Sequence, residues 1–230
     1  MIELFPDGFE EIERTDGVEL VAYTDPSGEE RLWKVFGHAS GSDVAEGWEE
    51  RWREFHRPAR VGDLWIGQPW QEAPADAIVV VIDPGRAFGT GAHPTTRLCL
   101  ELLAKLPRGS VVDVGCGSGV LSIAAAKLGF APVVGVDADE HAVEGTRQNA
   151  EANGVNVSVR QADALRDDLP AADVAIVNVT HEIVAAVARQ NRWPRLVASG
   201  YLVSEPPALE GYRHAERADE GGWAADVFER

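Results

Sequence analysis

The sequence predicts an α/β fold built on a doubly wound, mostly parallel sheet, with a small α/β appendage at the N-terminus. Three observations predict it. An apolar run at 111–114 leads through three alternating glycines into an alanine- and leucine-rich helix at 120–128. A second apolar run at 132–136 ends in an acid, Asp137, eighteen residues after Gly119. Strand and helix patterns then alternate to residue 204, as in a sheet covered by helices on both faces.

The first 57 residues predict the appendage. Residues 9–24 have the pattern of a hairpin with a Thr-Asp-Gly turn, and 29–36 that of a short helix. A helix expected from Asp43 carries an aromatic face, which is typical of a small core or a docking face. The residues of this face are Trp48, Trp52 and Phe55. We expect residues 1–57 to form the appendage, 58–76 an ordered connector and 77–230 the main domain.

The main domain begins with a buried strand at 78–82, followed by a glycine-rich loop at 83–96. Thr95 and Thr96 end this loop and are expected to cap a helix at 97–106. A loop of this composition before a sheet strand is more often a lid or binding loop than a simple connection. The remaining expected elements are strand 111–114, helix 120–128, strand 132–136, helix 140–153, strand 155–160, strand 173–179, helix 182–190, strand 196–204 and a terminal strand pair around 220–222.

Candidate binding residues follow the carboxyl ends of successive parallel strands, where ligands of doubly wound sheets bind. They are Asp113, Gly115, Asp137, Asp163 and Asn178. Each alone could be a turn former, but their common register favours one site. Gly115 and Gly117 allow a ligand to approach bare backbone at a helix N-terminus. Asp137 stands where a βαβ unit places an acid beside a ribose diol.

The glycine spacing indicates which nucleotide is bound. A dinucleotide fingerprint requires its third glycine at position 120, which is valine, and no Gly-Lys-Ser/Thr follows to cradle a triphosphate. The pattern from Asp113 to Gly119, acid-x-Gly-x-Gly-x-Gly, resembles motif I of the Rossmann-like methyltransferases that bind S-adenosylmethionine. A nicotinamide oxidoreductase remains an alternative, and titration with the two cofactors separates the two.

Composition limits the partners and the location. The chain has 230 residues, with 21 basic and 38 acidic side chains and a net charge of −17. This charge argues against nucleic acid and favours either a basic partner or a simply soluble surface. The longest apolar run is too short for a membrane span, and the N-terminus lacks a signal core, so we expect a cytoplasmic protein without membrane contact. Cys99 and Cys116 are too few for a metal site or a disulfide framework.

Three stretches together carry a more specific resemblance. They are Asp83-Pro84-Gly85-Arg86-Ala87-Phe88-Gly89-Thr90-Gly91-Ala92-His93-Pro94-Thr95-Thr96, Asp113-Val114-Gly115-Cys116-Gly117-Ser118-Gly119-Val120-Leu121 and Gly135-Val136-Asp137-Ala138-Asp139. Between residues 58 and 178 the chain resembles the PrmA family, class I methyltransferases that modify ribosomal protein L11. The resemblance implies S-adenosylmethionine as cofactor, a substrate-recognition role for the N-terminal appendage, and this basic ribosomal protein as partner.

The resemblance also implies roles for individual residues. Thr96, Gly115, Asp137 and Asn178 match cofactor-contacting positions, and 88–96, with Phe88, matches the cofactor-covering loop. Asp137 would hold the ribose hydroxyls and Asp163 would lie near the adenine. Gly115 and Gly117 would admit the methionine moiety, while Asp113 would fix the loop or meet the cofactor ammonium. Asn178 would orient the acceptor, a lysine ε-amine or an N-terminal α-amine, by accepting a hydrogen bond from it.

Departures from the family pattern leave these cofactor residues intact. The family's N-terminal domain is usually longer, Val179 is followed by Thr180 and His181 in place of an aliphatic pair, and 204–207 reads Ser-Glu-Pro-Pro. These changes keep three alternatives open: another protein acceptor, a small-molecule amine, or a non-catalytic S-adenosylmethionine-binding module. His93 is interpreted equally as a lid contact or as a backbone-bonded loop residue. A role for His181 as a base is less favoured, because a helix N-terminus disfavours its cationic form.

Overall fold

The computed structural model describes residues 10–14, 17–21, 32–35, 58–83 and 91–230. The chain divides into two compact units, residues 1–53 and 54–230. In the first unit, β1 (Glu10–Arg14) and β2 (Gly17–Val21) pair antiparallel, with Glu10 opposite Val21, as the expected hairpin requires. Residues 32–35 are helical. The aromatic helix expected from Asp43 lies outside the described residues.

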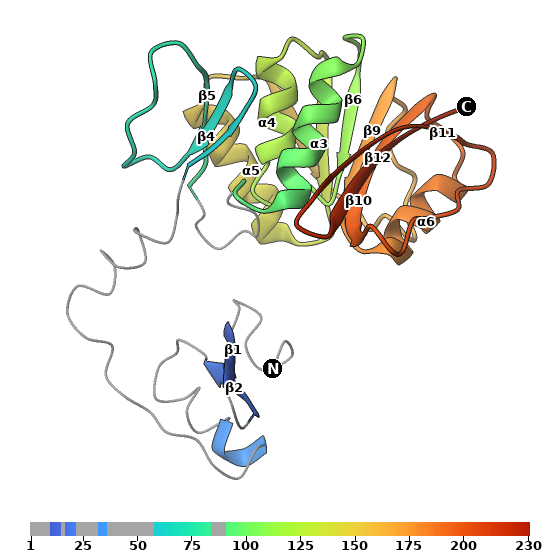
Figure 1. Cartoon of the computed structure of the whole chain (residues 1–230). Helices are drawn as coiled ribbons and strands as arrows, with labels where there is room; N and C mark the ends of the chain where they lie inside the picture. Colours follow the sequence, from blue (N-terminus) through green and yellow to red (C-terminus); the bar gives the residue numbers. More distant parts are fainter. Residues whose placement is uncertain (1–9, 15–16, 22–31, 36–57, 84–90) are drawn as a thin grey trace. The chain divides into compact units, whose positions relative to one another are not determined.

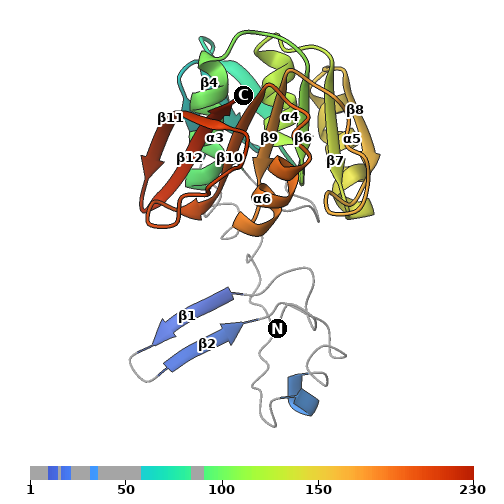
Figure 2. The same ribbon diagram turned by 90° about the vertical axis from the view of Figure 1, so that its right-hand side faces the viewer.

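The second unit is built on a seven-stranded sheet with the order β11-β12-β10-β9-β6-β7-β8 (Figure 2). The five strands from β10 to β8 in this order are parallel, and β12 runs antiparallel to both of its neighbours. The strands are β6 (Val111–Val114), β7 (Val133–Asp137), β8 (Val157–Gln161), β9 (Val174–Asn178), β10 (Arg195–Leu202), β11 (Arg213–Glu220) and β12 (Trp223–Glu229). The chain therefore reverses its direction of winding between β6 and β9, which are neighbours in the sheet.

Helices cover both faces of this sheet, as the alternation of strand and helix patterns predicts. On one face lie α3 (Pro94–Lys105), α4 (Val120–Lys127) and α5 (Glu140–Ala152), and on the other lies α6 (His181–Arg189) (Figures 1 and 2). Among the helices in the described ranges, none is long and apolar enough to cross a membrane.

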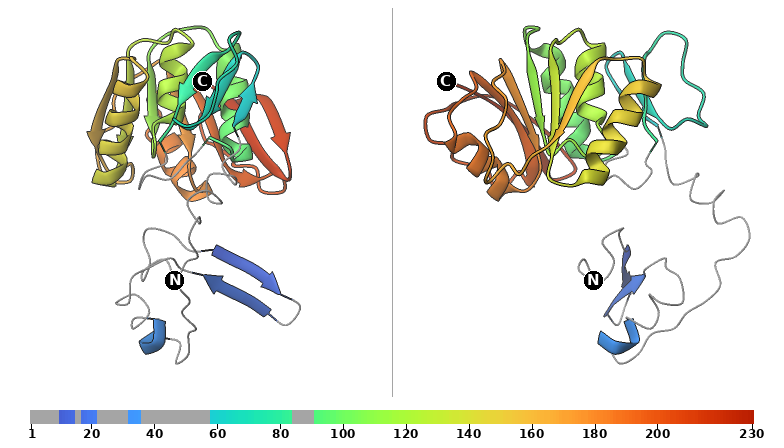
Figure 3. Two further views of the ribbon diagram at one scale, coloured as in Figure 1. Left: turned by 90° about the vertical axis from the view of Figure 1, so that its left-hand side faces the viewer. Right: turned by 180° about the vertical axis from the view of Figure 1, so that it is seen from behind.

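A second, three-stranded sheet packs on the outer side of α3 and α4 (Figure 3). It consists of β3 (Ala59–Val61), β4 (Leu64–Gly67) and β5 (Ile78–Val81), in that order. The region expected to be an ordered connector, 58–76, thus contains β3 and β4, and β4 pairs with β5, the first strand of the expected main domain. The boundaries at residues 57 and 76 remain a proposal.

Two hydrophobic clusters, one on each face, hold the sheet between its helices. Along β6, Val111 belongs to the cluster under α3 and α4, whereas Val112 and Val114 belong to the cluster under α6. Successive side chains of a strand point to opposite faces, and both faces are buried here. This explains why the parallel strands have continuous apolar sequences instead of alternating ones.

The helix after the glycine-rich loop begins earlier than the sequence predicts. We expected Thr95 and Thr96 to cap a helix starting at residue 97, but α3 starts at Pro94 and its N-cap is His93. Proline is favoured at the first helical position, because its fixed φ suits the helix and the missing N–H has no partner there. Both threonines are therefore buried in the first turn.

Candidate functional site

The site lies where β6 and β9 are neighbours and the chain reverses its winding. In open α/β sheets, ligands bind beyond the carboxyl ends of the strands at this switch point. The loop after β6 supplies Gly115 and Gly117, the end of β7 supplies Asp137, and the end of β9 supplies Asn178. The structure thus brings residues from three successive βα units to one edge of the sheet.

The glycine loop is shaped for close packing that side chains would prevent. Gly115 has a φ of +75°, and a β-carbon there would lie 2.5 Å from Cγ1 of Val179. Gly119 has a φ of +84° and is the N-cap of α4, and among the described residues no side chain makes a capping hydrogen bond there. Backbone N–H groups at an uncovered helix N-terminus attract anionic or polar ligand groups. The loop therefore offers bare backbone to a ligand.

Asp137 ties this loop to the end of β7. Its Oδ2 accepts a hydrogen bond from the backbone N–H of Gly117 at 2.9 Å, and its Oδ1 accepts one from the N–H of Asp139 at 3.0 Å. An ionised carboxylate has about four lone-pair positions, so further donors can still bind. The side chain is partly buried. It is thus oriented by backbone on both oxygens while keeping capacity for two hydroxyl groups.

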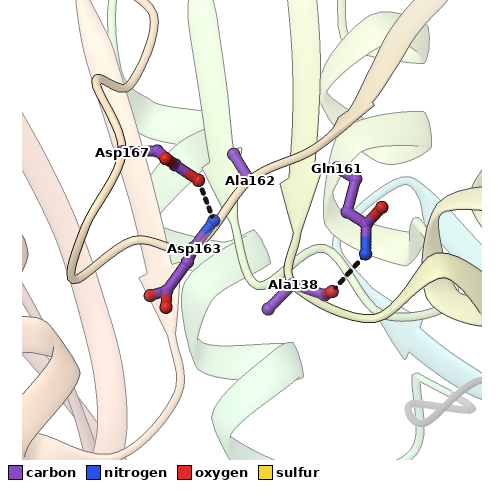
Figure 4. Close-up of a pocket in the computed structure, with 5 residues that line it drawn as sticks. All are labelled: Ala138, Gln161, Ala162, Asp163 and Asp167. Atoms are coloured by element: carbon purple, nitrogen blue, oxygen red, sulfur yellow. Dashed lines mark hydrogen bonds between the residues drawn. The ribbon is translucent and has the colours of Figure 1, made fainter.

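A shallow pocket adjoins Asp137 on the side of β8. Its volume is about 360 Å³, and it is lined by Ala138, Gln161, Ala162, Asp163 and Asp167. Figure 4 shows Gln161 and Ala138 on one side of the pocket, joined by a 2.8 Å hydrogen bond, and the two aspartates on the other. The N–H of Ala162 donates to the backbone oxygen of Asp137 at 2.8 Å, so the pocket and Asp137 belong to one continuous surface.

Thr96 and Asn178 meet although they are 82 residues apart. Nδ2 of Asn178 donates to Oγ1 of Thr96 at 3.4 Å, and Thr96 is only 5% exposed. The contact assigns the amide nitrogen of Asn178 to Thr96 and leaves its amide oxygen free to accept another hydrogen bond. Two residues that the resemblance assigns to cofactor-contacting positions are therefore in direct contact.

Asp113 lies below the rim of the site. It is 1% exposed, and its Oδ2 accepts a hydrogen bond from the hydroxyl of Ser122 in α4 at 2.7 Å. Burial raises the pKa of this carboxyl to about 6, although the Ser122 bond opposes the rise, and the nearby charge of Asp137 adds to it. Of the two roles considered for Asp113, this geometry favours fixing the glycine loop against α4 over contact with a ligand ammonium.

His93 and His181 lie in different environments. His93 caps α3, because its Nδ1 accepts the backbone N–H of Thr95 at 3.3 Å and lies 2.8 Å from the Thr95 hydroxyl. Burial and the charge of Arg97 lower the pKa of His93, which favours the neutral ring that this cap requires. His181 is exposed at the start of α6, with its ring edge-on to Tyr201 at 6.1 Å. Phe88 lies outside the described residues.

The sequence reasoning missed the contribution of the turn between β11 and β12. Trp223 pairs with Leu202 at the carboxyl end of β10, and its ring packs edge-on against His93 at a centroid distance of 5.0 Å. Glu220, on the other side of this turn, forms an ion pair with Arg97 of α3. The available signal was the Gly221-Gly222 pair flanked by an acid and a tryptophan, which predicts the hairpin but not what it contacts.

Gly200 is a second residue that sequence reasoning missed. It lies at a bulge in β10 with a φ of +98°, and a β-carbon there would overlap the backbone oxygen of Val179. Bulges next to functional sites commonly re-aim a neighbouring segment. Gly200 therefore allows the loop that follows Asn178 to lie directly against β10.

Comparison with known proteins connects these features to one family. The chain matches the family described as Ribosomal protein L11 methyltransferase (PrmA) over residues 13–205. A ribosomal protein L11 methyltransferase of Aeromonas hydrophila subsp. hydrophila is 40% identical over 210 residues, which cover 82% of this chain and 70% of that protein. One of Caldanaerobacter subterraneus subsp. tengcongensis is 42% identical, covering 83% of this chain and 67% of that protein.

A solved structure supports the same relationship. The crystal structure of ribosomal protein L11 methylase from Lactobacillus delbrueckii subsp. bulgaricus is 25% identical, with a TM-score of 0.69. The match covers 76% of this chain and 99% of that chain. The predicted Rossmann-like, class I methyltransferase fold is thereby confirmed.

Proposed function

Because this chain belongs to the family of ribosomal protein L11 methyltransferases (PrmA), we propose that it transfers methyl groups from S-adenosylmethionine to amino groups of ribosomal protein L11. The observation that carries the proposal is the switch-point site itself. There Asp137 is bonded to the glycine loop and Asn178 to Thr96, so a cofactor side and an acceptor side adjoin each other. The net charge of −17 suits a basic protein acceptor.

The residues present fit S-adenosylmethionine. Gly115 and Gly117 provide bare backbone before the start of α4, where the N-cap is Gly119, and a β-carbon at Gly115 would collide with Val179. Asp137 keeps lone pairs for ribose hydroxyls, and the pocket at Asp163 lies beside it for the adenine. When bound, the cofactor supplies an already activated methyl group. The chain's own task is then to bind, orient and exclude water.

The acceptor that this site suits is an amine, either a lysine ε-amine or an N-terminal α-amine. Such groups have pKa values of about 10.4 and 7.7–8.0 and must lose a proton before they can react. A nearby positive charge and partial removal of water both lower these pKa values, so the proton can leave to solvent without a dedicated base. Asn178 accepts a hydrogen bond from the amine through its amide oxygen and so orients the amine lone pair. Thr96 holds the opposite side of that amide.

The proposed acceptor is a ribosomal protein, so we expect the reaction in the cytoplasm. Asp163 and Asp137 act on the cofactor side, and Asn178 acts where the two sides meet. The departures at 179–181 and 204–207 lie on the acceptor side and specifically favour a second candidate, in which the same chemistry acts on another protein or a small amine.

The test is the intact mass of ribosomal protein L11 after incubation with this protein and S-adenosylmethionine. We expect mass increases in steps of one methyl group, and peptide mapping then distinguishes lysine from the N-terminus. Asp137→Ala is expected to abolish the increases by loss of cofactor binding. Asp76→Ala serves as the matched control, because Asp76 is exposed and, within the described ranges, its one ion pair is with Arg60. If cofactor binds but no methyl groups are added, L11 is not the acceptor, and a different acceptor or a non-catalytic binding module becomes the better interpretation.

A further inference from the structure

One guanidinium joins the start of α3, which contacts Asn178 through Thr96, to the end of β11. In α3, Nε of Arg97 donates to Oε2 of Glu220 at 3.1 Å, and NH2 donates to Oε1 at 2.6 Å. The remaining nitrogen, NH1, donates to the backbone oxygen of Ala92. A fork-to-fork pair of this kind has more geometric specificity than a single contact between point charges. Arg97 thus holds the start of α3 and the end of β11 at the same time.

A second contact joins the same two segments. The ring of Trp223, just after the turn, packs against His93, the N-cap of α3. The turn is also held from β10, because the N–H of Val203 donates to the backbone oxygen of Gly222 at 2.9 Å. Residues 92–97 and 220–223 therefore form one unit, which we call the hairpin clamp.

The hairpin clamp adjoins the residue that is proposed to orient the acceptor. Thr96 lies within it and accepts the hydrogen bond from Asn178. In the sheet order, β10, β12 and β11 lie on the opposite side of β9 from the strands that carry the glycine loop and Asp137. The turn between β11 and β12 is therefore on the acceptor side of Asn178, whereas 92–96 overlaps the segment that the resemblance assigns to covering the cofactor.

We propose that Arg97 and Glu220 are positioning residues for the acceptor: their ion pair holds the turn between β11 and β12 as a wall beside Asn178. This inference rests on the proposed methyl transfer. Neither side chain need touch the reacting atoms, since they act through Thr96, His93 and Trp223. Misplacement by about 1 Å at a distance from the reacting atoms can lower a rate by up to about a hundredfold. A paired surface charge at such a place has more effect on the reaction than on the stability of the fold.

The chain contains its own matched control. Lys105, at the other end of α3, pairs with Glu216 of β11 at 2.8 Å, so it joins the same helix and strand far from Asn178. The carboxylates are similarly exposed, 44% for Glu216 and 48% for Glu220. Glu216→Gln and Glu220→Gln therefore remove similarly exposed carboxylates from the two ends of one helix–strand contact, with Lys105 keeping its ion pair to Glu101.

The experiment measures KM for L11, kcat, cofactor Kd and Tm for Glu220→Gln, Arg97→Gln, the double variant and Glu216→Gln. For Glu220→Gln we expect the KM for L11 to rise about five- to tenfold, and by a larger factor than the Kd for S-adenosylmethionine, because Glu220 belongs to the turn on the acceptor side. The double variant should be no worse than Arg97→Gln alone, since the two residues act as one unit. Glu216→Gln should match the wild type.

Two results would overturn the proposal. One is an equal effect of Glu220→Gln and Glu216→Gln on the KM for L11, and the other is an effect of Glu220→Gln that appears only as a lower Tm. If the wild type fails to methylate L11, the proposed function fails, and amide hydrogen exchange then tests the clamp by itself. Glu220→Gln, but not Glu216→Gln, should accelerate exchange in both 92–97 and 220–223. Unchanged exchange there would refute the clamp.

Discussion

Replacing Asp113 by asparagine is expected to stabilise the protein near neutral pH and to have much less effect at pH 4. Asp113 is 1% exposed, and within the described part of the chain its Oδ1 has no hydrogen-bond partner. Burial raises the pKa of the carboxyl from its usual 3.8 to about 6, and Asp137 adds to the rise, against the lowering effect of Ser122. Ionised Asp113 is thus less favourable in the folded chain than in the unfolded chain.

The sign of the pH dependence follows from where the proton binds more tightly. Because the pKa of Asp113 is higher in the folded state, the stabilisation is fully present below pH 3.8 and is lost as the pH rises through about 6. At about 1.4 kcal/mol for each pKa unit, the free energy of unfolding falls by about 3 kcal/mol across this range. Asparagine does not titrate, and its amide oxygen can still accept the Ser122 hydroxyl.

Urea unfolding of the wild type and Asp113→Asn from pH 4 to 7.5 measures this effect. Because it is taken as the difference in free energy of unfolding between the two proteins, the contributions of other titrating groups cancel. The variant should gain about 2–3 kcal/mol relative to the wild type between these pH values. Asp173→Asn is a control for which the pH dependence of stability should have the opposite sign. Hydrogen bonds from Ser110 lower the pKa of Asp173, so its stabilisation is present above its usual pKa and is lost as the pH falls. If the difference in free energy of unfolding between the wild type and Asp113→Asn stays constant with pH, the raised pKa of Asp113 is refuted.

Three further predictions concern single contacts of the site. Thr96→Val removes the hydroxyl that accepts the hydrogen bond from the Asn178 amide but keeps the volume of the side chain. The rate constant of methyl transfer in single-turnover assays should therefore fall about five- to tenfold, with Tm nearly unchanged. Gly200→Ala places a β-carbon on the backbone oxygen of Val179 and should lower the free energy of unfolding by about 2–4 kcal/mol. Gly129→Ala is the control, because Gly129 also has a positive φ (+93°) but open space around it, so alanine there causes backbone strain without a collision. Equal losses in the free energy of unfolding for the two variants would contradict the proposed collision. Asp137→Asn should raise the Kd for S-adenosylmethionine by about ten- to a hundredfold in calorimetry, and an unchanged Kd would remove Asp137 from the cofactor site.

Local sequence determined the elements of the main sheet and the glycine loop. Apolar runs buried on both faces, such as 111–114, are distinctive, and the glycines after β6 adopt the positive φ that only glycine reaches easily. Since the carboxyl ends of parallel strands meet at one edge, the positions of Gly115, Asp137 and Asn178 near one another followed from the order of the elements alone. The predicted start of α3 was wrong, because proline at the first helical position had more influence than the threonines that follow it.

Only the tertiary structure decided which side chains meet across the chain. The hydrogen bond between Thr96 and Asn178 and the ion pair between Arg97 and Glu220 each join residues that are far apart in the sequence. The approach of Gly200 to Val179 depends on a bulge between neighbouring strands. Local propensity and periodicity carry no information about such contacts, because they depend on how strands and helices are registered against one another. The sequence alone therefore determined the fold and brought together the residues proposed for the cofactor side, whereas the contacts proposed to shape the acceptor side depend on packing between distant segments.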